Sequence, residues 1–298
     1  MPRRIPYSRD PDDLLHPGRA TDFFDPSFGP IPSDAALCSE MARLAYVRHE
    51  EGDGRTRLEG FLHRAGFELG TCVDAAGTQG FVASRAGGGD PVTVVAFRGT
   101  EPDKLVDLLR DLDALPSPGT GGGRVHRGFA KALDAVGEPV RAAALEAPGR
   151  LVFTGHSLGA AIALLAAGLV PAERRNQTSV YTFGCPRVGD KDFVSSLAWL
   201  SHFRCAGACD LVSLVPPVSL FPFVHHGAFH CIDREGTSHE CGLGEQGHNA
   251  AKSFRTPCGF SSTFLLQLFP RLLAGKVPLD ALSDHAPINY TSALWALR

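Results

Sequence analysis

The amino-acid sequence predicts an α/β fold in which a mostly parallel central sheet carries helices on both faces. From residue 150 onward, short β-rich runs alternate with segments whose apolar residues recur at helical spacing. Such alternation is typical of parallel strands joined by crossover helices. The chain has 298 residues, of which 44% are hydrophobic and 20% charged, so it can bury the core of one large domain.

The first part of the chain is rich in proline and charge, and we expect residues 1–34 to form an extended arm rather than a folded unit. Residues 35–298 are predicted to form a single α/β domain. A helix is expected to begin here, with Ser33 or Asp34 capping its first turn. Residues 78–100 are expected to form a hairpin around a glycine-rich turn.

The remaining elements follow in the order that a parallel sheet needs. An amphipathic helix over 104–115 precedes a loop rich in proline and glycine. The elements expected after that loop are a helix over 130–146, a strand over 150–155, a helix over 158–169, a strand over 179–186, a helix over 190–200 and a strand over 202–207. The uncharged stretch 151–170 is divided by its glycines and His156 into a strand and a helix. Each piece is too short to cross about 30 Å of hydrocarbon.

Charge and composition argue against several kinds of partner and location. The formal net charge is −3 and no dense Lys/Arg cluster occurs, which argues against nucleic acid as a partner. The chain contains eight cysteines, and we expect free thiols or a few incidental disulfide bonds rather than a disulfide framework. Arg3 and Arg4 are not followed by an apolar stretch, so we expect a cytoplasmic protein. The sequons at Asn176 and Asn289 leave a secreted origin open, if a leader has been removed.

The stretch VFTGHSLGAA at 152–161 raises the central question about function. It contains the pattern G-x-S-x-G around Ser157, in which the two glycines let a strand turn sharply into a helix and present the serine hydroxyl. A serine is a poor nucleophile until a base accepts its proton, and the base needs an acid that orients it. His156, beside the serine in this turn, is interpreted as a packing residue.

Candidate acids and bases lie downstream of the serine, in the order acid and then histidine that such turns favour. Asp210 ends an apolar run and precedes a proline-bounded loop, which places it at the carboxyl end of a strand. Asp190 and Asp192 are weaker candidates, because they fall in the first turn of an expected helix and suit its dipole. His285, expected in a loop near the C-terminus, is the leading base.

The histidines and cysteines between residues 225 and 248 offer a metal site as an alternative. Their spacing fits no familiar zinc pattern. His225 and His226 would also point to opposite faces of a strand. We therefore predict neither a metal site nor a cofactor. The residues of this cluster are His225, His226, His230, Cys231, His239, Cys241 and His248.

Six short motifs in a fixed order resemble those of the class 3 lipase family. The motifs are VVAFRGT, VHRGF, FTGHSLGAA, YTFGCPRVGD, DLVSLVPP and DHAPINY. The resemblance implies an α/β-hydrolase fold with Ser157 as nucleophile, Asp210 as acid and His285 as base. It also implies an oxyanion hole formed by the backbone N–H groups of Thr100 and Leu158.

Residues 101–123 fall where the family carries a lid. The apolar face of an amphipathic helix there would cover the acyl site in water and turn toward a lipid surface. The alternative is an ordinary amphipathic helix packed on the core.

The sequence thus predicts a serine carboxylic-ester hydrolase of lipase type, acting on acylglycerols or other fatty-acyl esters through an acyl-enzyme on Ser157. Two alternatives stay open: an esterase for short-chain or aryl esters, and a non-catalytic binding protein of the same fold. The expected partner is a lipid or ester small molecule, with transient lipid-surface contact through residues 101–123. Neither nucleic acid nor a cofactor is expected, and the sequence predicts nothing about oligomeric state.

Overall fold

A central sheet organises the computed structural model, which describes residues 5–6, 22–87, 89–100, 115–207, 210–233, 237–240 and 279–296. Within these residues, eight strands form one sheet in the order β1-β2-β3-β6-β7-β8-β9-β10. The strands are β1 (Glu68–Ala75), β2 (Thr78–Arg85), β3 (Val92–Phe97), β6 (Arg150–His156), β7 (Thr178–Phe183), β8 (Ser201–Gly207), β9 (Ala228–Ile232) and β10 (Ser238–Glu240). A separate pair joins β4 (Pro116–Pro118) to β5 (Arg124–His126).

The middle of the sheet is parallel and its two ends are antiparallel. Strands β3, β6, β7, β8 and β9 pair in parallel. The hairpin β2–β3 confirms the expectation for residues 78–100, and β1 extends it by a strand that was not predicted. At the other end β10 turns back along β9. The mostly parallel sheet predicted from the sequence is confirmed.

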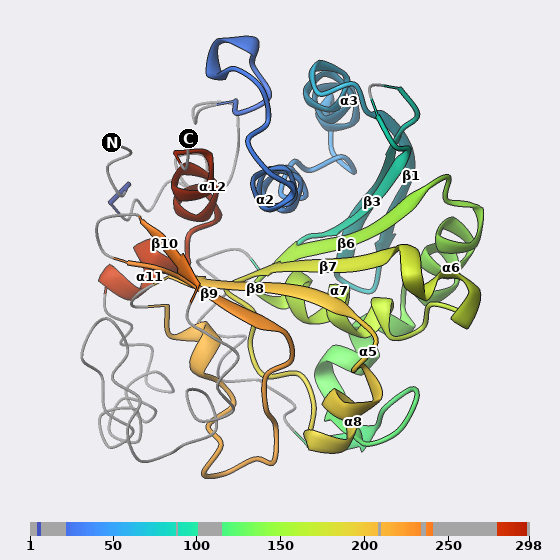
Figure 1. Ribbon diagram of the computed structural model, residues 1–298, viewed down its shortest axis with the longest axis vertical. Coiled ribbons are helices and arrows are strands. Elements are labelled where there is room, and N and C mark those ends of the chain that lie inside the picture. The colour runs from blue at the N-terminus through green and yellow to red at the C-terminus, as the bar shows by residue number, and fades with distance from the viewer. Residues whose placement is uncertain are drawn as a thin grey trace.

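Helices cover both faces of this sheet (Figure 1). One face carries α2, which lies across β3, β6 and β7 and contacts α12; the other carries α5, α6 and α7. The helices are α2 (Asp34–Leu44), α3 (Gly54–Arg64), α5 (Arg127–Asp134), α6 (Gly137–Glu146), α7 (Leu158–Ala167), α8 (Lys191–Ser196), α11 (Leu279–His285) and α12 (Pro287–Trp295). Short 3-10 turns occupy Pro26–Phe28, Ala172–Gln177 and Val212–Leu214.

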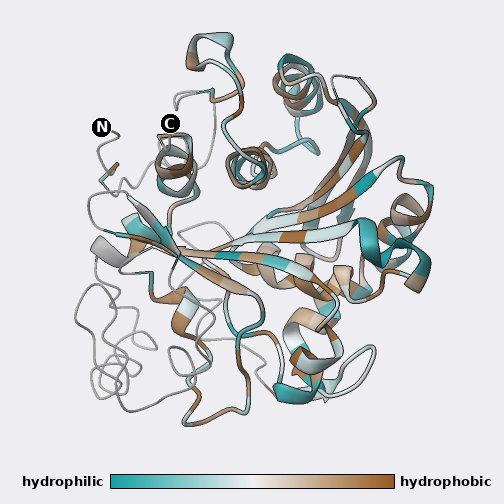
Figure 2. Cartoon of the chain, in the orientation of Figure 1, coloured by the Kyte–Doolittle hydropathy of each residue, from teal (hydrophilic) through white to brown (hydrophobic). Residues whose placement is uncertain are grey.

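The two helices nearest the sheet centre form for different reasons. Helix α2 begins after Ser33, whose Oγ accepts a hydrogen bond from the N–H of Ala36 at 3.1 Å, so Ser33 is the N-cap. Helix α7 is apolar on every side, and its residues from Gly159 to Ala167 are all buried. A helix without a polar face belongs in the interior. The hydropathy colouring in Figure 2 shows this apolar material between the layers.

Three sequence-based expectations for individual elements were wrong. The single helix over 130–146 is two helices, because Pro139 lacks an N–H and is tolerated only in a first turn, so a new helix begins at Gly137. The strand-like segment around the histidine pair is extended only over Ala228–Ile232, after Gly227 turns with φ +91°. His285 ends helix α11 rather than lying in a loop.

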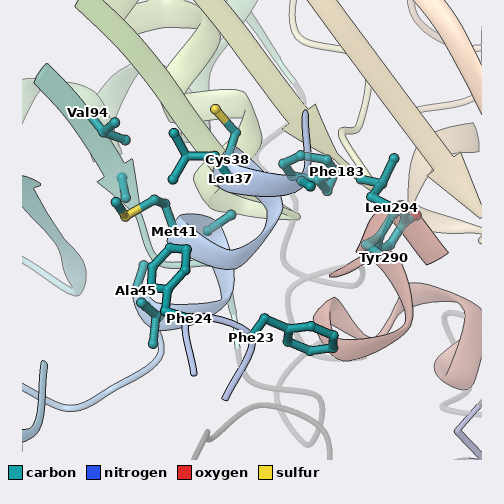
Figure 3. Packing of buried hydrophobic residues seen from close by; sticks show 14 of the residues in the cluster. Phe23, Phe24, Leu37, Cys38, Met41, Ala45, Val94, Phe183, Tyr290 and Leu294 are labelled. Carbon is teal, nitrogen blue, oxygen red and sulfur yellow. The ribbon is translucent and has the colours of Figure 1, made fainter. Parts of the chain in front are cut away.

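Residues 22–28, on the arm side of the predicted boundary at residue 34, pack onto the domain. The rings of Phe23 and Phe24 lie 5.5 Å and 6.2 Å from the ring of Trp295 in α12. Both phenylalanines are buried in one cluster with Met41 of α2, as Figure 3 shows. The two-part division of the chain stays a prediction.

The predicted lid segment and the absence of a membrane span can be compared only with the described residues. Of the segment 101–123, residues 101–114 lie outside the described residues, and the rest contains β4 and a glycine turn. No helix among the described residues is long and apolar enough to span a membrane.

Candidate active site

The parallel strands bring the predicted site residues to one edge of the sheet. Strand β6 ends at His156, directly before Ser157, and β3 leads into the turn that contains Thr100. Strand β8 runs toward Asp210. Since the carboxyl ends of parallel strands share one edge, residues far apart in the sequence meet there.

Ser157 lies in a sharp turn between β6 and α7. Its backbone has φ 57° and ψ −124°, and its N–H donates to the carbonyl of Phe183 at 3.0 Å. A Cβ on Gly155 would lie 2.3 Å from the carbonyl of Gly159, and one on Gly159 would lie 2.2 Å from the carbonyl oxygen of Phe97. Both glycines of G-x-S-x-G are therefore required by close backbone approach. The Ser157 side chain is placed at the N-terminus of α7 and is fully buried.

Asp210 and His285 form a direct pair. Nδ1 of His285 donates to Oδ2 of Asp210 at 2.8 Å, and both side chains are buried. The other carboxylate oxygen, Oδ1, accepts the N–H of Val212 at 2.8 Å. Because Asp210 fixes the proton on Nδ1, the other ring nitrogen of His285, Nε2, is left as a proton acceptor.

Tyr290 of α12 also contacts Asp210, and it was not among the predicted site residues. Its hydroxyl donates to Oδ2 of Asp210 and accepts the N–H of Gly207 at 2.9 Å. Burial, followed by the Asp210 carboxylate, raises the pKa of Tyr290 well above its usual range, so the phenol stays a donor. Figure 3 shows Tyr290 beside Phe183 under the sheet. The tyrosine at the end of DHAPINY was the available signal.

Two polar atoms of the site have no hydrogen-bond partner within the described part of the chain. These are Oγ of Ser157 and Nε2 of His285, both buried. Serine and histidine of a nucleophilic pair often lack a tight hydrogen bond until substrate is present. The hydroxyl of Ser157 can therefore donate a proton, and Nε2 of His285 can accept one, without breaking a hydrogen bond to another described residue.

Of the two predicted oxyanion-hole residues, Leu158 directly follows the serine, and Thr100 adjoins a glycine that lies close to it. Leu158 is the first residue of α7, where backbone N–H groups point away from the helix without an intrahelical acceptor. Thr100 follows Gly99, and a Cβ on Gly99 would lie 3.0 Å from Cβ of Ser157. The role of Leu158 and Thr100 in an oxyanion hole stays a prediction.

His156 is buried, as its interpretation as a packing residue requires, yet its ring also makes two hydrogen bonds. Nδ1 lies 2.7 Å from the hydroxyl of Tyr46, and Nε2 lies 2.5 Å from the backbone oxygen of His285. Burial, followed by the neighbouring His285, lowers the pKa of His156 well below its usual range. Tyr46, which lies just after α2, was not found from the sequence.

The weaker candidates have structural partners. Asp190 caps α8, accepting the N–H of Phe193 at 2.9 Å, as its helix-start position predicted. His225 bonds to the carbonyl of Ser213, whereas His226 faces His202, with 3.1 Å between their Nδ1 atoms. No group of three metal-binding side chains occurs among the described residues. Cys241 and His248 of the considered metal cluster lie outside them.

A pocket of about 400 Å³ lies between the start of α8 and a segment that follows Asp210 in the sequence. Val218 and residues 221–224 form its apolar side, and residues 190–192 form its polar side. Ser157, Asp210 and His285 do not line it. Its apolar side comes from residues that lie between Asp210 and β9 in the sequence.

Comparison with known proteins agrees with this geometry. Residues 94–220 match the family model described as Lipase (class 3). This matched segment contains both Ser157 and Asp210, and it resembles the class 3 lipase family. One curated relative is the lipase of Rhizomucor miehei, which is 32% identical over 159 residues, covering 49% of the chain and 43% of the relative. Another is Toxin TseL of Vibrio cholerae, 35% identical over 132 residues, covering 42% of the chain and 20% of the relative.

Solved structures of lipases have a similar fold. A Rhizomucor miehei lipase in complex with its propeptide matches with a TM-score of 0.60 at 22% identity, covering 78% of this chain and 76% of that one. This likeness confirms the α/β-hydrolase fold. The chain aligns with less than half the length of the curated relatives described above.

Proposed function

We propose that this chain is a serine carboxylic-ester hydrolase of lipase type. The observation that carries the proposal is the buried Asp210–His285 pair, with its 2.8 Å hydrogen bond, at the same sheet edge as the strained turn of Ser157. Each part has a chemical use in acyl transfer, and the family provides a precedent for that use.

The reaction begins when Oγ of Ser157 attacks the ester carbonyl and Nε2 of His285 takes its proton. Asp210 holds the imidazole in the Nδ1–H tautomer and stabilises the imidazolium that forms. The N–H groups of Thr100 and Leu158 donate to the oxyanion of the tetrahedral intermediate. His285 then protonates the departing alcohol, and the acyl group stays on Ser157. Water, deprotonated by His285, releases the acid and restores the serine. These steps require only the chain's own residues.

Fatty-acyl esters, including acylglycerols, are the proposed substrates. The apolar side of the 400 Å³ pocket can accept a hydrocarbon chain, and its residues lie between Asp210 and β9 in the sequence. A similar protein from Rhizomucor miehei is a lipase by name. Because Ser157 is fully buried, we further propose that residues 101–123 contact a lipid surface when substrate enters.

Labelling with a fluorophosphonate tests the proposed nucleophile without knowledge of the substrate. We expect one adduct, detected by intact mass, on the wild type and none on Ser157→Ala. Ser195→Ala, which removes an exposed hydroxyl on α8, is the matched control and should label like the wild type. An unlabelled wild type, both in buffer and with detergent micelles, would favour a non-catalytic binding protein.

Acyl-chain preference separates a lipase from the alternative esterase. We expect kcat/KM to rise from acetyl to octanoyl and longer esters, because each methylene that enters an apolar pocket contributes favourable transfer energy. A maximum at acetyl or at aryl esters, with no gain from longer chains, would identify an esterase for small substrates.

A further inference from the structure

His156 connects two parts of the site that come from distant regions of the sequence. Covalently, it precedes Ser157. Through Nε2 it holds the main-chain oxygen of His285 at 2.5 Å, across 129 positions of sequence. Its ring also packs 4.4 Å from the ring of His285. A single residue therefore bridges the turn that carries the serine and the helix that carries the base.

The partners of His156 determine where its proton lies. A carbonyl oxygen only accepts hydrogen bonds, so Nε2 must carry the proton in its contact with His285. In the neutral ring Nδ1 is then an acceptor, and the Tyr46 hydroxyl donates to it at 2.7 Å. Burial and the adjacent His285 lower the pKa of His156, which favours the neutral ring.

Tyr46 is itself held against the turn that leads to Thr100. A Cβ on Gly99 would lie 2.3 Å from the Tyr46 hydroxyl and 2.4 Å from the carbonyl oxygen of His156. Three elements of the site thus meet at one pair of hydrogen-bonded side chains: the Ser157 turn, the Gly99–Thr100 turn and the end of α11. Displacement of His156 would change the distances among all three.

A neutral ring at this position also suits the charge that develops during the proposed reaction. His285 becomes an imidazolium when it takes the serine proton. A second positive charge within 4.4 Å would oppose that step, whereas a neutral imidazole does not. Asp210 then remains the charged partner of His285.

We propose that His156 is a positioning residue: as a neutral Nε2–H imidazole oriented by Tyr46, it fixes the main chain of His285 relative to Ser157. The inference rests on the proposed hydrolase function. It differs from a packing role because the two hydrogen bonds, rather than the volume of the ring, set the geometry.

Two replacements of His156 separate hydrogen bonding from volume. His156→Leu keeps apolar bulk and removes both bonds, whereas His156→Gln offers an N–H to His285 and an acceptor to Tyr46 without a titrating group. On p-nitrophenyl butyrate we expect His156→Leu to lower kcat about 10²-fold with KM within about twofold, since small misplacements of reacting groups cost this much. The acidic limb of the kcat/KM–pH profile, along which the base His285 loses its proton, should shift, and His156→Gln should recover at least about tenfold of the lost kcat.

Tyr46→Phe and His202→Gln complete the series. Tyr46→Phe removes the donor to Nδ1 while keeping the ring, and we expect a loss of kcat between those of the two His156 variants. His202 is also buried and also bonded through both ring nitrogens, to Thr182 and His226, so His202→Gln is the matched control. Its kcat should stay within about twofold of the wild type.

The outcomes separate this inference from the proposed function. If the wild type takes no fluorophosphonate, the hydrolase proposal is wrong. If the wild type labels and His156→Leu matches its kcat and pH profile, only the positioning role is wrong. A kcat for His156→Gln as low as that for His156→Leu, or an equal loss in His202→Gln, also overturns it. Should His156→Leu fail to fold, His156→Gln and Tyr46→Phe decide.

Nitrogen-15 NMR of histidine side chains gives a test that does not depend on activity. We expect the His156 ring, assigned by its loss in His156→Gln, to show the Nε2–H tautomer at pH 7. It should stay neutral on acidification to about pH 5, where an ordinary histidine is charged. An Nδ1–H tautomer, or titration near pH 6.5, would overturn the proposal.

Discussion

The backbone of Ser157 has φ 57°, a conformation that costs a residue with a Cβ of the order of 1–3 kcal/mol. The surrounding structure holds it, because the N–H of Ser157 donates to the carbonyl of Phe183 and the backbone packs closely at Gly155 and Gly159. The strain places the hydroxyl at the N-terminus of α7. The strain at Ser157 therefore lowers the stability of the fold at the proposed nucleophile.

Glycine at position 157 should release this strain. We expect Ser157→Gly to be more stable than Ser157→Ala by about 1 kcal/mol, although glycine normally costs more chain entropy. Both variants lack Oγ, so the difference between their free energies of unfolding reports the backbone strain at position 157. Urea unfolding of the pair measures it, and an alanine variant of equal or greater stability would show that the turn is unstrained.

Replacing Tyr290 tests how much Asp210 depends on the hydrogen bond from the Tyr290 hydroxyl. Tyr290→Phe removes the hydroxyl from Asp210 and leaves the N–H of Gly207 without its acceptor. We expect a loss of about 1–3 kcal/mol in the free energy of unfolding. The kcat should fall roughly 10-fold or more, because a less constrained carboxylate orients His285 less well. Tyr181→Phe, a partly buried phenol on β7, is the control and should retain wild-type kcat.

The turn after β7 shows how a whole element is shaped around the site. Gly184 has φ +60°, and a Cβ there would lie 2.7 Å from Oδ2 of Asp210 and 2.9 Å from Nδ1 of His285. Strand β7 must be followed by a residue without a side chain, since any Cβ there would enter the hydrogen bond between acid and base.

Gly184→Ala should therefore damage activity more than its backbone strain alone would predict. The matched variant is Gly77→Ala in the β1–β2 turn, where φ is +81° and nothing lies within 4 Å of an added Cβ. Both should lose stability through the positive φ. Only Gly184→Ala should lose kcat, by roughly 10²-fold. Equal kcat in the two variants would show that the acid–base pair adjusts to the added methyl.

Elements with strong local signals were predicted well, and the others depended on tertiary contacts. The alternation of strands and helices after residue 150, the hairpin and the Ser33 cap follow from periodicity and capping chemistry. The break between α5 and α6 was missed because the apolar residues keep helical spacing across it. Only Pro139 indicates that a new helix begins there. The helical setting of His285 was missed because α11 is short, with only seven residues from Leu279 to His285.

The site followed the same division. Ser157, Asp210 and His285 could be chosen because chain order and motif context limit the options for each role. Tyr46 carries no such signal, because its meeting with His156 spans 110 positions and depends on how α2 crosses the sheet. The hydrogen bonds of the His156 ring could not be predicted either, since its acceptor is a main-chain carbonyl and leaves no mark in the sequence.

Across the whole molecule, buried neutral histidines link folding to pH. Burial is the largest cause that lowers the pKa values of His156, His202 and His226 from the usual 6.5. Below about pH 6.5 the unfolded chain takes up protons at these positions and the folded chain does not, so stability falls on acidification. The contribution is fully present above that pH and is lost toward the folded-state pKa values. Burial raises the pKa of Glu40, which acts in the opposite sense.

The His202–His226 pair is the part of this dependence that can be removed without touching the site. Its rings are stacked, and nearby Arg204 further lowers both pKa values. Each histidine contributes up to about 1.4 kcal/mol per pH unit, so His202→Gln/His226→Gln should flatten the slope of unfolding free energy by up to about 2.7 kcal/mol per unit between pH 6 and 5. Urea unfolding at pH 7.5, 6.0 and 5.0 measures both proteins. Because Glu40 and the carboxylates are common to both, they cancel in the difference, and parallel curves would mean that the pair is already protonated in the folded chain.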